Sequence, residues 1–212
     1  MSNWKSKVSP AVIRRLPRYY RFLRDIRGMG MNRVSSSMLS ELSGYTASQV
    51  RQDFNTFGGF GQQGYGYNVD DLMDGIGRIL GIDKKYSVVI IGAGNLGRAL
   101  ARHSWPPSGS IEIVSLFDNS PLIVDQKIGD IPVRNVNELS DFLADPGADI
   151  GVITTDWDIA QSIANKLVAG GIKGIWNFTP VDIETPGNVI VSSVHLSDSL
   201  HELIYYINNI GE

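Results

Sequence analysis

The residues YSVVIIGAGNLG, Tyr86–Gly97, decide the fold of this chain. An apolar run of strand length is followed at once by a Gly-x-Gly-x-x-Gly turn and then by the helical residues 98–103. Gly92 allows a tight bend in such a turn, Gly94 lets a pyrophosphate approach the backbone, and Gly97 lets the helix pack closely. This order predicts the first strand, turn and helix of a dinucleotide-binding domain.

The nucleotide is expected to lie on this turn. Free N–H groups and the helix dipole favour an anionic pyrophosphate there, so we assign to it Gly92, Ala93, Gly94, Asn95, Leu96 and Gly97. A second strand, Ile111–Phe117, ends in Asp118, where an acidic residue can hold the adenosine ribose 2′-OH. Because a carboxylate repels a 2′-phosphate, we expect NAD(H) rather than NADP(H).

Strands and helices continue to alternate after this point. Strands are predicted at 150–154, 174–178 and 189–194, and a helix at 157–168. This alternation indicates an α/β Rossmann domain with a doubly wound parallel sheet, in which ligands lie beyond the carboxyl ends of the strands. We therefore place near the nicotinamide Thr154, Thr155, Asn177, Phe178, Thr179 and Pro180. Ordinary strand-to-loop chemistry is the alternative for each of them.

Composition excludes several other classes of protein. The 212 residues include no cysteine, which excludes disulfides, thiolate metal sites and cysteine nucleophiles. Three histidines without HExxH-like spacing make us expect no metal. No stretch approaches the roughly 20 apolar residues that span a bilayer, and no signal peptide is visible, so we expect a soluble cytoplasmic protein with no membrane partner.

The charge is divided unevenly along the chain. Residues 1–85 hold 13 Lys and Arg against 7 Asp and Glu, whereas residues 86–212 hold 6 against 15. A basic first half and an acidic second half are typical of a chain whose first half meets phosphate.

The basic half reads as helical. Apolar residues recur at helical spacing over 10–28, and Pro17 indicates a helix start or kink, so that 10–15 can form a separate turn. A short helix capped by Ser35–Ser36 ends at Gly44, and a second helix begins at a capping box of Thr46 and Gln49. These two helices match a helix-turn-helix, although an ordinary helical hairpin with a polar face is the alternative.

A glycine-rich hairpin is predicted next. In residues 57–69, strand alternation at Tyr65, Tyr67 and Val69 favours a wing over a flexible linker. Asp70 is expected to cap a further helix that Gly81 closes. In a winged helix the second helix enters the major groove, where Gln suits adenine and Arg suits guanine or phosphate. The expected DNA-binding residues are Arg14, Ser35, Ser36, Ser48, Gln49, Arg51, Gln52, Gln62, Gln63 and Tyr65.

The end of the chain is too short for a substrate domain. Only an amphipathic segment, 197–209, follows the last strand, and no Tyr-x-x-x-Lys pair is present. We expect no catalytic residues and no enzymatic activity. A terminal helix this apolar favours a C2 dimer in which the helix is exchanged. The expected domains are 1–80 (winged helix), 81–194 (Rossmann) and 195–212 (dimerisation helix).

Six blocks in one order resemble the Rex family of bacterial redox-sensing transcriptional repressors. The blocks are Arg15–Leu23, Val34–Ser36, Val50–Gly58, Gly64–Val69, Gly92–Gly97 and Gly171–Pro180. The resemblance implies a homodimer with exchanged terminal helices on a palindromic operator in double-stranded DNA. It also implies that NADH releases the DNA and that NAD⁺ permits binding.

The chain departs from the family pattern at three places. The family usually has basic residues in the recognition helix and the wing, where this chain has Gln52, Gln62 and Gln63. The slope of the logarithm of DNA affinity against the logarithm of salt concentration should therefore be shallower by about 0.9 for each lost phosphate contact. The family pairs an Asp near the last helix with an Arg of the first helix, and His195 and Arg21 stand there in this chain. Candidate coupling residues are therefore Arg21, His103, His195 and Asp198.

Two other functions remain as alternatives. An NAD-dependent oxidoreductase with a helical appendage predicts cofactor turnover. A CoA- or nucleotide-binding interaction module that never touches DNA predicts no salt-dependent DNA affinity.

Overall fold

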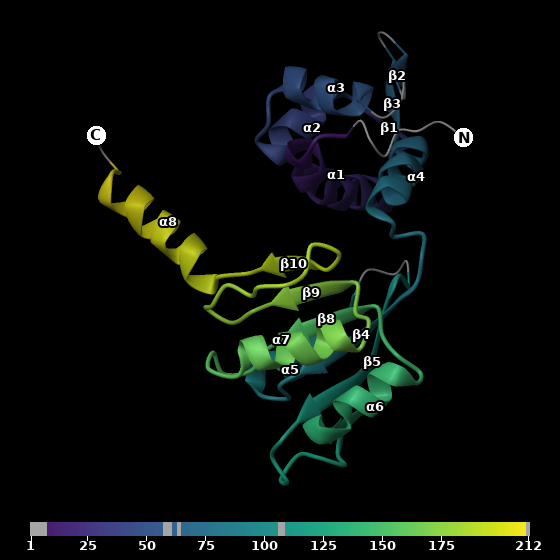
Figure 1. Cartoon of the computed structure of the whole chain (residues 1–212). Helices are drawn as coiled ribbons and strands as arrows, with labels where there is room; N and C mark the ends of the chain where they lie inside the picture. The colour runs from purple at the N-terminus through teal and green to yellow at the C-terminus, as the bar shows by residue number, and fades with distance from the viewer. Residues whose placement is uncertain (1–7, 57–60, 63–64, 106–108, 211–212) are drawn as a thin grey trace. The chain divides into compact units, whose positions relative to one another are not determined.

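The computed structural model describes residues 8–56, 61–62, 65–105 and 109–210. The chain divides into two compact units, Met1–Lys84 and Lys85–Glu212, each of which contains its own hydrophobic core. Figure 1 shows the helices and strands of both units.

The first unit is a winged helix. It consists of α1 (Pro10–Gly28), β1 (Arg33–Val34), α2 (Ser36–Ser43), α3 (Ala47–Asn55), β2 (Gly61–Gln62), β3 (Gly66–Asn68) and α4 (Val69–Leu80). Strand β3 pairs antiparallel with both β1 and β2, which confirms the fold and adds β1, a strand that the sequence did not predict. The buried aromatic rings of Tyr19 and Phe54 meet edge to face, with centroids 5.2 Å apart, at the centre of the core.

Three local expectations for this unit need correction. Residues 10–15 are not a separate turn, because α1 is one helix that Ser9 caps, and Pro17 lies within it on the exposed side. Helix α4 is capped by Asn68 rather than Asp70, since the Asn68 side chain accepts from the Asp71 N–H. Thr46 caps α3 as expected, but the Gln49 side chain does not complete the capping box and bonds to Asp53 instead.

The second unit is the expected Rossmann domain. Its sheet runs β10-β9-β8-β4-β5-β7-β6, in which β6 is antiparallel to β7 and the remaining pairs are parallel. The strands are β4 (Tyr86–Ile91), β5 (Ile111–Asp118), β6 (Lys127–Ile128), β7 (Ile131–Asn135), β8 (Ile150–Ile153), β9 (Gly174–Asn177) and β10 (Ile190–Ser193). The strand order reverses between β4 and β8, the switch point at which such sheets bind ligands.

Helices cover both faces of this sheet. They are α5 (Asn95–Arg102), η2 (Val136–Glu138), α6 (Leu139–Ala144) and α7 (Ala160–Ala169). Side chains of α6 and α7 share one buried cluster with the sheet, whereas Leu100 of α5 belongs to another. The sequence predicted no element between β5 and β8, where the structure has β6, β7, η2 and α6. The last helix, α8 (Leu196–Asn208), leaves the sheet after β10 (Figure 1). None of its residues is buried.

A buried ion pair joins α3 to α1. Asp53, which is fully buried, accepts from Arg15 Nε and Nη2, each at 2.7 Å, from Tyr19 Oη at 2.9 Å and from Gln49 Nε2 at 2.8 Å. Burial by itself raises the pKa of Asp53, but the hydrogen bonds from Arg15, Gln49 and Tyr19 outweigh burial and hold that pKa below its ordinary value. The carboxylate is therefore ionised and anchors the helix.

Replacing this carboxylate is predicted to destabilise the first unit. Asp53→Asn leaves the partly exposed Arg15 without its ionic partner, which should lower the free energy of unfolding by about 1.5–3 kcal/mol at pH 7, the range for hydrogen bonds to a charged group. Because the folded pKa of Asp53 is lowered, its contribution is present above pH ~4 and is lost as pH falls through the folded value. The difference in the free energy of unfolding between the variant and the unmodified chain, measured by urea unfolding, should therefore become smaller below pH ~4. Asp25→Asn, at an exposed site on α1, is the control and should change stability by less than about 0.5 kcal/mol. A deficit independent of pH would contradict the assignment.

Candidate functional site

The expected DNA-reading residues of α3 form an accessible surface. Ser48, Arg51 and Gln52 are exposed, and Gln49 is partly exposed. Arg51 Nη1 donates to the hydroxyl of Ser36 over 3.0 Å, so the structure brings together two residues predicted from separate helices. The N-terminal end of α3 thus presents polar side chains, as a recognition helix does.

The other predicted DNA-contacting residues surround this helix. Ser35 accepts from the Met38 N–H and caps α2, so its side chain already has a structural partner. Arg14 is exposed on α1, and Tyr65 is 71% exposed beside Arg33, whose guanidinium lies 6.0 Å from the ring centroid. Gln62 lies in β2, and Gln63 lies outside the described residues.

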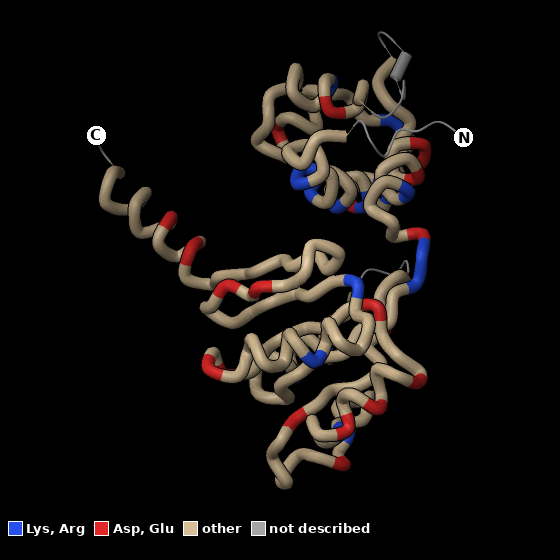
Figure 2. The backbone as a smooth tube through the Cα atoms, viewed as in Figure 1, with Lys and Arg blue, Asp and Glu red and all other residues tan. Residues whose placement is uncertain are grey.

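The positive charge of the first unit is concentrated on α1, where Figure 2 shows a row of basic residues. Some of these arginines have partners: Arg27 Nε pairs with Asp70 over 2.9 Å, and Arg18 lies 5.5 Å from the ring centroid of Tyr45. Arg14, Arg21 and Arg24 are exposed. This basic helix belongs to the same unit as the predicted recognition helix.

In the second unit, β4, α5 and β8 meet at the glycine turn. Gly92 has a φ of 101°, and a side chain there would put its Cβ 2.6 Å from the carbonyl oxygen of Thr154. A Cβ on Gly97 would collide with the Gly92 carbonyl oxygen. Thr154 Oγ1 donates to that same oxygen over 2.8 Å. Gly92 and Gly97 therefore have the packing roles that the fingerprint predicts.

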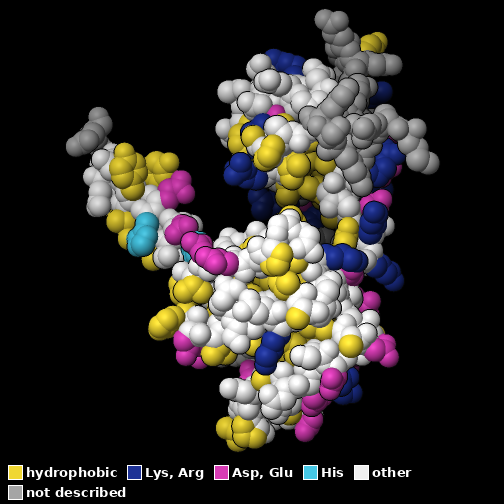
Figure 3. All heavy atoms as spheres, in the orientation of Figure 1, with side chains coloured by type: hydrophobic (Ala, Val, Ile, Leu, Met, Phe, Trp, Pro, Cys, Tyr) yellow, Lys and Arg dark blue, Asp and Glu magenta, His cyan; other side chains and the backbone are white. Residues whose placement is uncertain are grey.

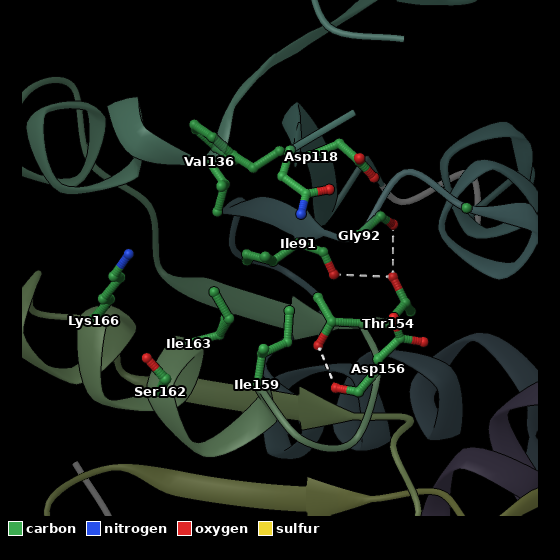
Figure 4. A pocket seen from close by; sticks show the side chains of 14 residues that line it. Ile91, Gly92, Asp118, Val136, Thr154, Asp156, Ile159, Ser162, Ile163 and Lys166 are labelled. Carbon is green, nitrogen blue, oxygen red and sulfur yellow. Dashed lines mark hydrogen bonds between the residues drawn. The ribbon is translucent and has the colours of Figure 1, made fainter. Parts of the chain in front are cut away.

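A cavity of about 440 Å³ lies at the carboxyl ends of β4, β5 and β8 (Figure 4). Its size suits a nucleotide or drug-sized ligand. Apolar walls come from Ile91, Phe117, Val136, Ile159 and Ile163. The polar and glycine lining residues are Gly92, Gly94, Asp118, Asn119, Thr154, Thr155, Asp156, Ser162 and Lys166.

Asp118 connects β5 to the glycine turn. Its Oδ2 accepts from the Ala93 N–H over 2.7 Å, and its Oδ1 accepts from the Ser120 N–H over 2.8 Å. The carboxylate is partly exposed and lines the cavity, so each oxygen keeps a lone pair for a ribose hydroxyl. The predicted contact with the ribose fits this position.

The residues predicted near the nicotinamide separate into two groups. Thr154 and Thr155 line the cavity. Asn177, Phe178, Thr179 and Pro180 do not line it. The Asn177 Oδ1 accepts from the backbone and hydroxyl of Thr179, and both residues are buried. Their side chains therefore shape the loop after β9, and their contact with a nucleotide stays a prediction.

The sequence did not predict several of the residues that line the cavity. Asn119 directly follows the predicted site residue Asp118, so the sequence could have indicated that it lines the cavity. Val136 lies on η2, in a segment for which the sequence predicted no element. Ile159, which precedes α7, and the α7 face with Ser162, Ile163 and Lys166 could not be assigned without knowing how that helix packs on the sheet.

The candidate coupling residues lie in both units. Arg21 is exposed on α1, with its guanidinium 5.3 Å from the Phe22 ring centroid. His195 precedes the first turn of α8, which contains Asp198, and the exposed His103 follows α5 beside Trp105. Within the described ranges, no cluster of three or more His, Asp or Glu residues could hold a metal, and no helix is long and apolar enough to cross a membrane.

Comparison with family models divides the chain in the same way. Residues 7–55 match a putative DNA-binding protein N-terminus, and residues 83–181 match a CoA binding domain. These segments fall within the winged helix and the nucleotide-binding fold, apart from short overlaps at the boundary.

Close relatives match almost the whole chain. The redox-sensing transcriptional repressor Rex of Thermoanaerobacter pseudethanolicus is 49% identical over 204 residues, which cover 96% of this chain and 91% of the relative. Rex of Caldicellulosiruptor bescii is 50% identical over 204 residues, or 96% of this chain and 94% of the relative.

Solved structures lead to the same family. RSP, a Rex-family repressor solved with β-NAD⁺ and operator DNA, superposes with a TM-score of 0.89 at 49% identity, covering 95% of this chain and 93% of RSP. RSP with β-NADH gives a TM-score of 0.87 at 46% identity, with 95% of each chain covered. The winged helix, the Rossmann sheet with its glycine turn, and similarity over nearly the full length together show that this chain belongs to the Rex family of redox-sensing transcriptional repressors.

Proposed function

We propose that this chain is a homodimeric repressor that binds a palindromic operator and is released from it by NADH. The observation that carries the proposal is the combination, in one chain about half identical to Rex relatives, of an accessible helix-turn-helix and a nucleotide-sized cavity. RSP, which is similar over 95% of this chain, has been solved with operator DNA and with both nucleotides. Operator binding in a bacterial cell gives the chain a cytoplasmic location.

The glycine turn fits a dinucleotide. A Cβ built on Gly94 meets no described atom within 4 Å, so internal packing does not require glycine at this position. Among the residues that the structure describes, no side chain caps the first turn of α5, which leaves its N–H groups available to an anion. A pyrophosphate approaching the backbone accounts for both features.

The nucleotide acts as an effector and not as a redox cofactor for catalysis. The relatives are repressors, which confirms that the chain is not an enzyme. NAD⁺ and NADH differ by a hydride and one charge on the nicotinamide, so only the surroundings of that ring can separate them. A poorly hydrated pocket favours the neutral, reduced ring. If NADH prefers a dimer geometry that does not fit the operator, operator binding must weaken NADH binding by the same factor.

Helix α8 supplies the dimer contact. Large hydrophobic side chains lie exposed along it, among them Leu200, Leu203, Ile204 and Ile207, and Figure 3 shows hydrophobic side chains on this helix. In a homodimer with exchanged terminal helices, these side chains are buried against the partner. Arg21, His103, His195 and Asp198 remain the proposed link between the nucleotide and DNA sites.

The dimer can be tested on α8. Ile204→Asp should produce monomers in sedimentation velocity, because burying one isoleucine contributes about 1.5–3 kcal/mol and a C2 dimer counts each residue twice. Ser199→Asp adds the same charge to the same helix at an exposed polar position and should remain dimeric. A dimer unaffected by Ile204→Asp would contradict the proposed contact.

Two glycine variants separate nucleotide binding from folding. Gly94→Ala should leave thermal unfolding without nucleotide unchanged but weaken NADH binding about tenfold, because a methyl at a packed contact costs about 1–3 kcal/mol. Gly97→Ala should lower the free energy of unfolding by at least about 1–3 kcal/mol, since its Cβ collides with the backbone of Gly92. Equal NADH affinity in Gly94→Ala and the unmodified chain, measured by calorimetry, would place the nucleotide elsewhere.

The regulatory response can be measured directly. NADH should weaken binding of the operator duplex of the RSP complex by about 5- to 150-fold at fixed salt, whereas NAD⁺ should leave it intact. Fluorescence anisotropy of the labelled duplex measures both titrations. Equal effects of the two nucleotides would refute redox sensing, and salt-independent binding would refute the DNA interface.

A further inference from the structure

The carboxylate of Asp53 determines how the amide of Gln49 is oriented. Gln49 Nε2 donates to Asp53 Oδ1 over 2.8 Å. Arg15 holds the same carboxylate with two parallel hydrogen bonds, the geometry of a bidentate ion pair. An ionised carboxylate accepts hydrogen bonds and cannot donate them, so the amide nitrogen of Gln49, and not its oxygen, must face Asp53.

The carboxylate itself has no freedom to move. Its Oδ1 accepts from Arg15 and Gln49, and its Oδ2 accepts from Arg15 and Tyr19. Two lone pairs on each oxygen are thereby occupied. Arg15 and Tyr19 belong to α1, so the group that orients Gln49 is fixed to a different helix from the one that carries Gln49.

This contact leaves one edge of the Gln49 amide available. Gln49 is the third residue of α3 and is partly exposed. Its Oε1 accepts no hydrogen bond from any residue in the described part of the chain, and one N–H of Nε2 remains. Adenine presents an N7 acceptor and an N6 donor in the major groove, whereas guanine presents the acceptors O6 and N7. With the N–H trans to Oε1 on Asp53, the N–H cis to Oε1 remains free, and this edge of one acceptor beside one donor is complementary to adenine.

We propose that Gln49 reads one adenine in each operator half-site, and that Asp53, paired with Arg15, is the positioning residue that fixes the amide for this contact. The proposal rests on the proposed function, in which α3 enters the major groove. Gln52, one turn further along the same helix, provides the contrast. Its side chain is exposed and has no hydrogen-bond partner among the described residues, so its amide can rotate and carries no fixed pattern.

The test uses base analogues in the operator duplex of the RSP complex. Each adenine of the half-site is replaced in turn by 7-deazaadenine, which pairs normally with thymine but lacks the N7 acceptor. At one position the analogue should weaken binding of the unmodified chain at least about fivefold, the lower end of what a bidentate side chain–base contact provides. Gln49→Met, which matches the length of the side chain, should bind more weakly and show no further loss at that position.

Gln52→Met is the matched control and should keep the sensitivity to 7-deazaadenine at the same position. If Gln49→Met remains sensitive at every adenine that the unmodified chain senses, the inference is wrong. It is also wrong if the unmodified chain senses no adenine. Failure of the unmodified chain to bind the duplex, or to be released by NADH, would instead refute the proposed function.

The positioning role of Asp53 has its own readout. In Asp53→Asn the new amide can present either a donor or an acceptor to Gln49, so the amide of Gln49 is no longer fixed. The ratio of affinities for duplexes with A·T and G·C at the sensed position should therefore fall toward one. A loss of folded protein affects both duplexes equally, so this ratio tests orientation even where the variant is less stable. An unchanged ratio would show that Asp53 acts only on stability.

Discussion

Three hydrogen bonds from Arg15 and Tyr19 of α1 to the buried carboxylate of Asp53 hold the recognition helix against α1. Because every lone pair of the Asp53 carboxylate accepts a hydrogen bond, α3 is not free to shift within its unit. We therefore do not expect a nucleotide bound in the other unit to act by moving α3 within its own unit. It can change DNA affinity by changing where the two winged helices of a dimer are placed. The rigid unit thus makes the regulation a matter of geometry between subunits.

A second constraint is the close backbone packing at the glycine turn of the Rossmann domain. Gly92, Gly97 and Thr154 bring the backbones of β4, α5 and β8 so close that no side chain fits between them. This packing sets the floor of the cavity and leaves Gly94 and the uncapped end of α5 available to a pyrophosphate. We therefore expect the adenosine end of the proposed site to be preformed and the discrimination between NAD⁺ and NADH to arise at the nicotinamide. The loop after β9 is tied internally through Asn177 and Thr179, and its contact with the nicotinamide remains a prediction.

The sequence predicted the features that depend on local pattern. The strand at Tyr86–Ile91, the glycine turn and the cap at Thr46 follow from periodicity and from residue types with one strong conformational preference. Features that depend on contacts between distant segments were missed. The pairing of Arg15 with Asp53 joins residues 38 positions apart, and the α7 face of the cavity is defined only by its packing on the sheet. The prediction of a separate turn before Pro17 was wrong because buried side chains on both sides of Pro17 pack α1 into the core as one helix.

The most direct measurement is the distance between the two recognition units of a dimer in each nucleotide state. The chain contains no cysteine, so Glu41→Cys, at an exposed position of α2, accepts one spin label per protomer. Pulsed electron–electron double resonance then reports the distance between the two spin labels of the dimer with saturating NAD⁺ and operator, and with saturating NADH. We expect two distinct distance distributions. The distribution of the NAD⁺ state alone should be compatible with recognition helices one DNA turn or a multiple of it apart, in steps of about 34 Å. Superimposable distributions in the two states would contradict this expectation.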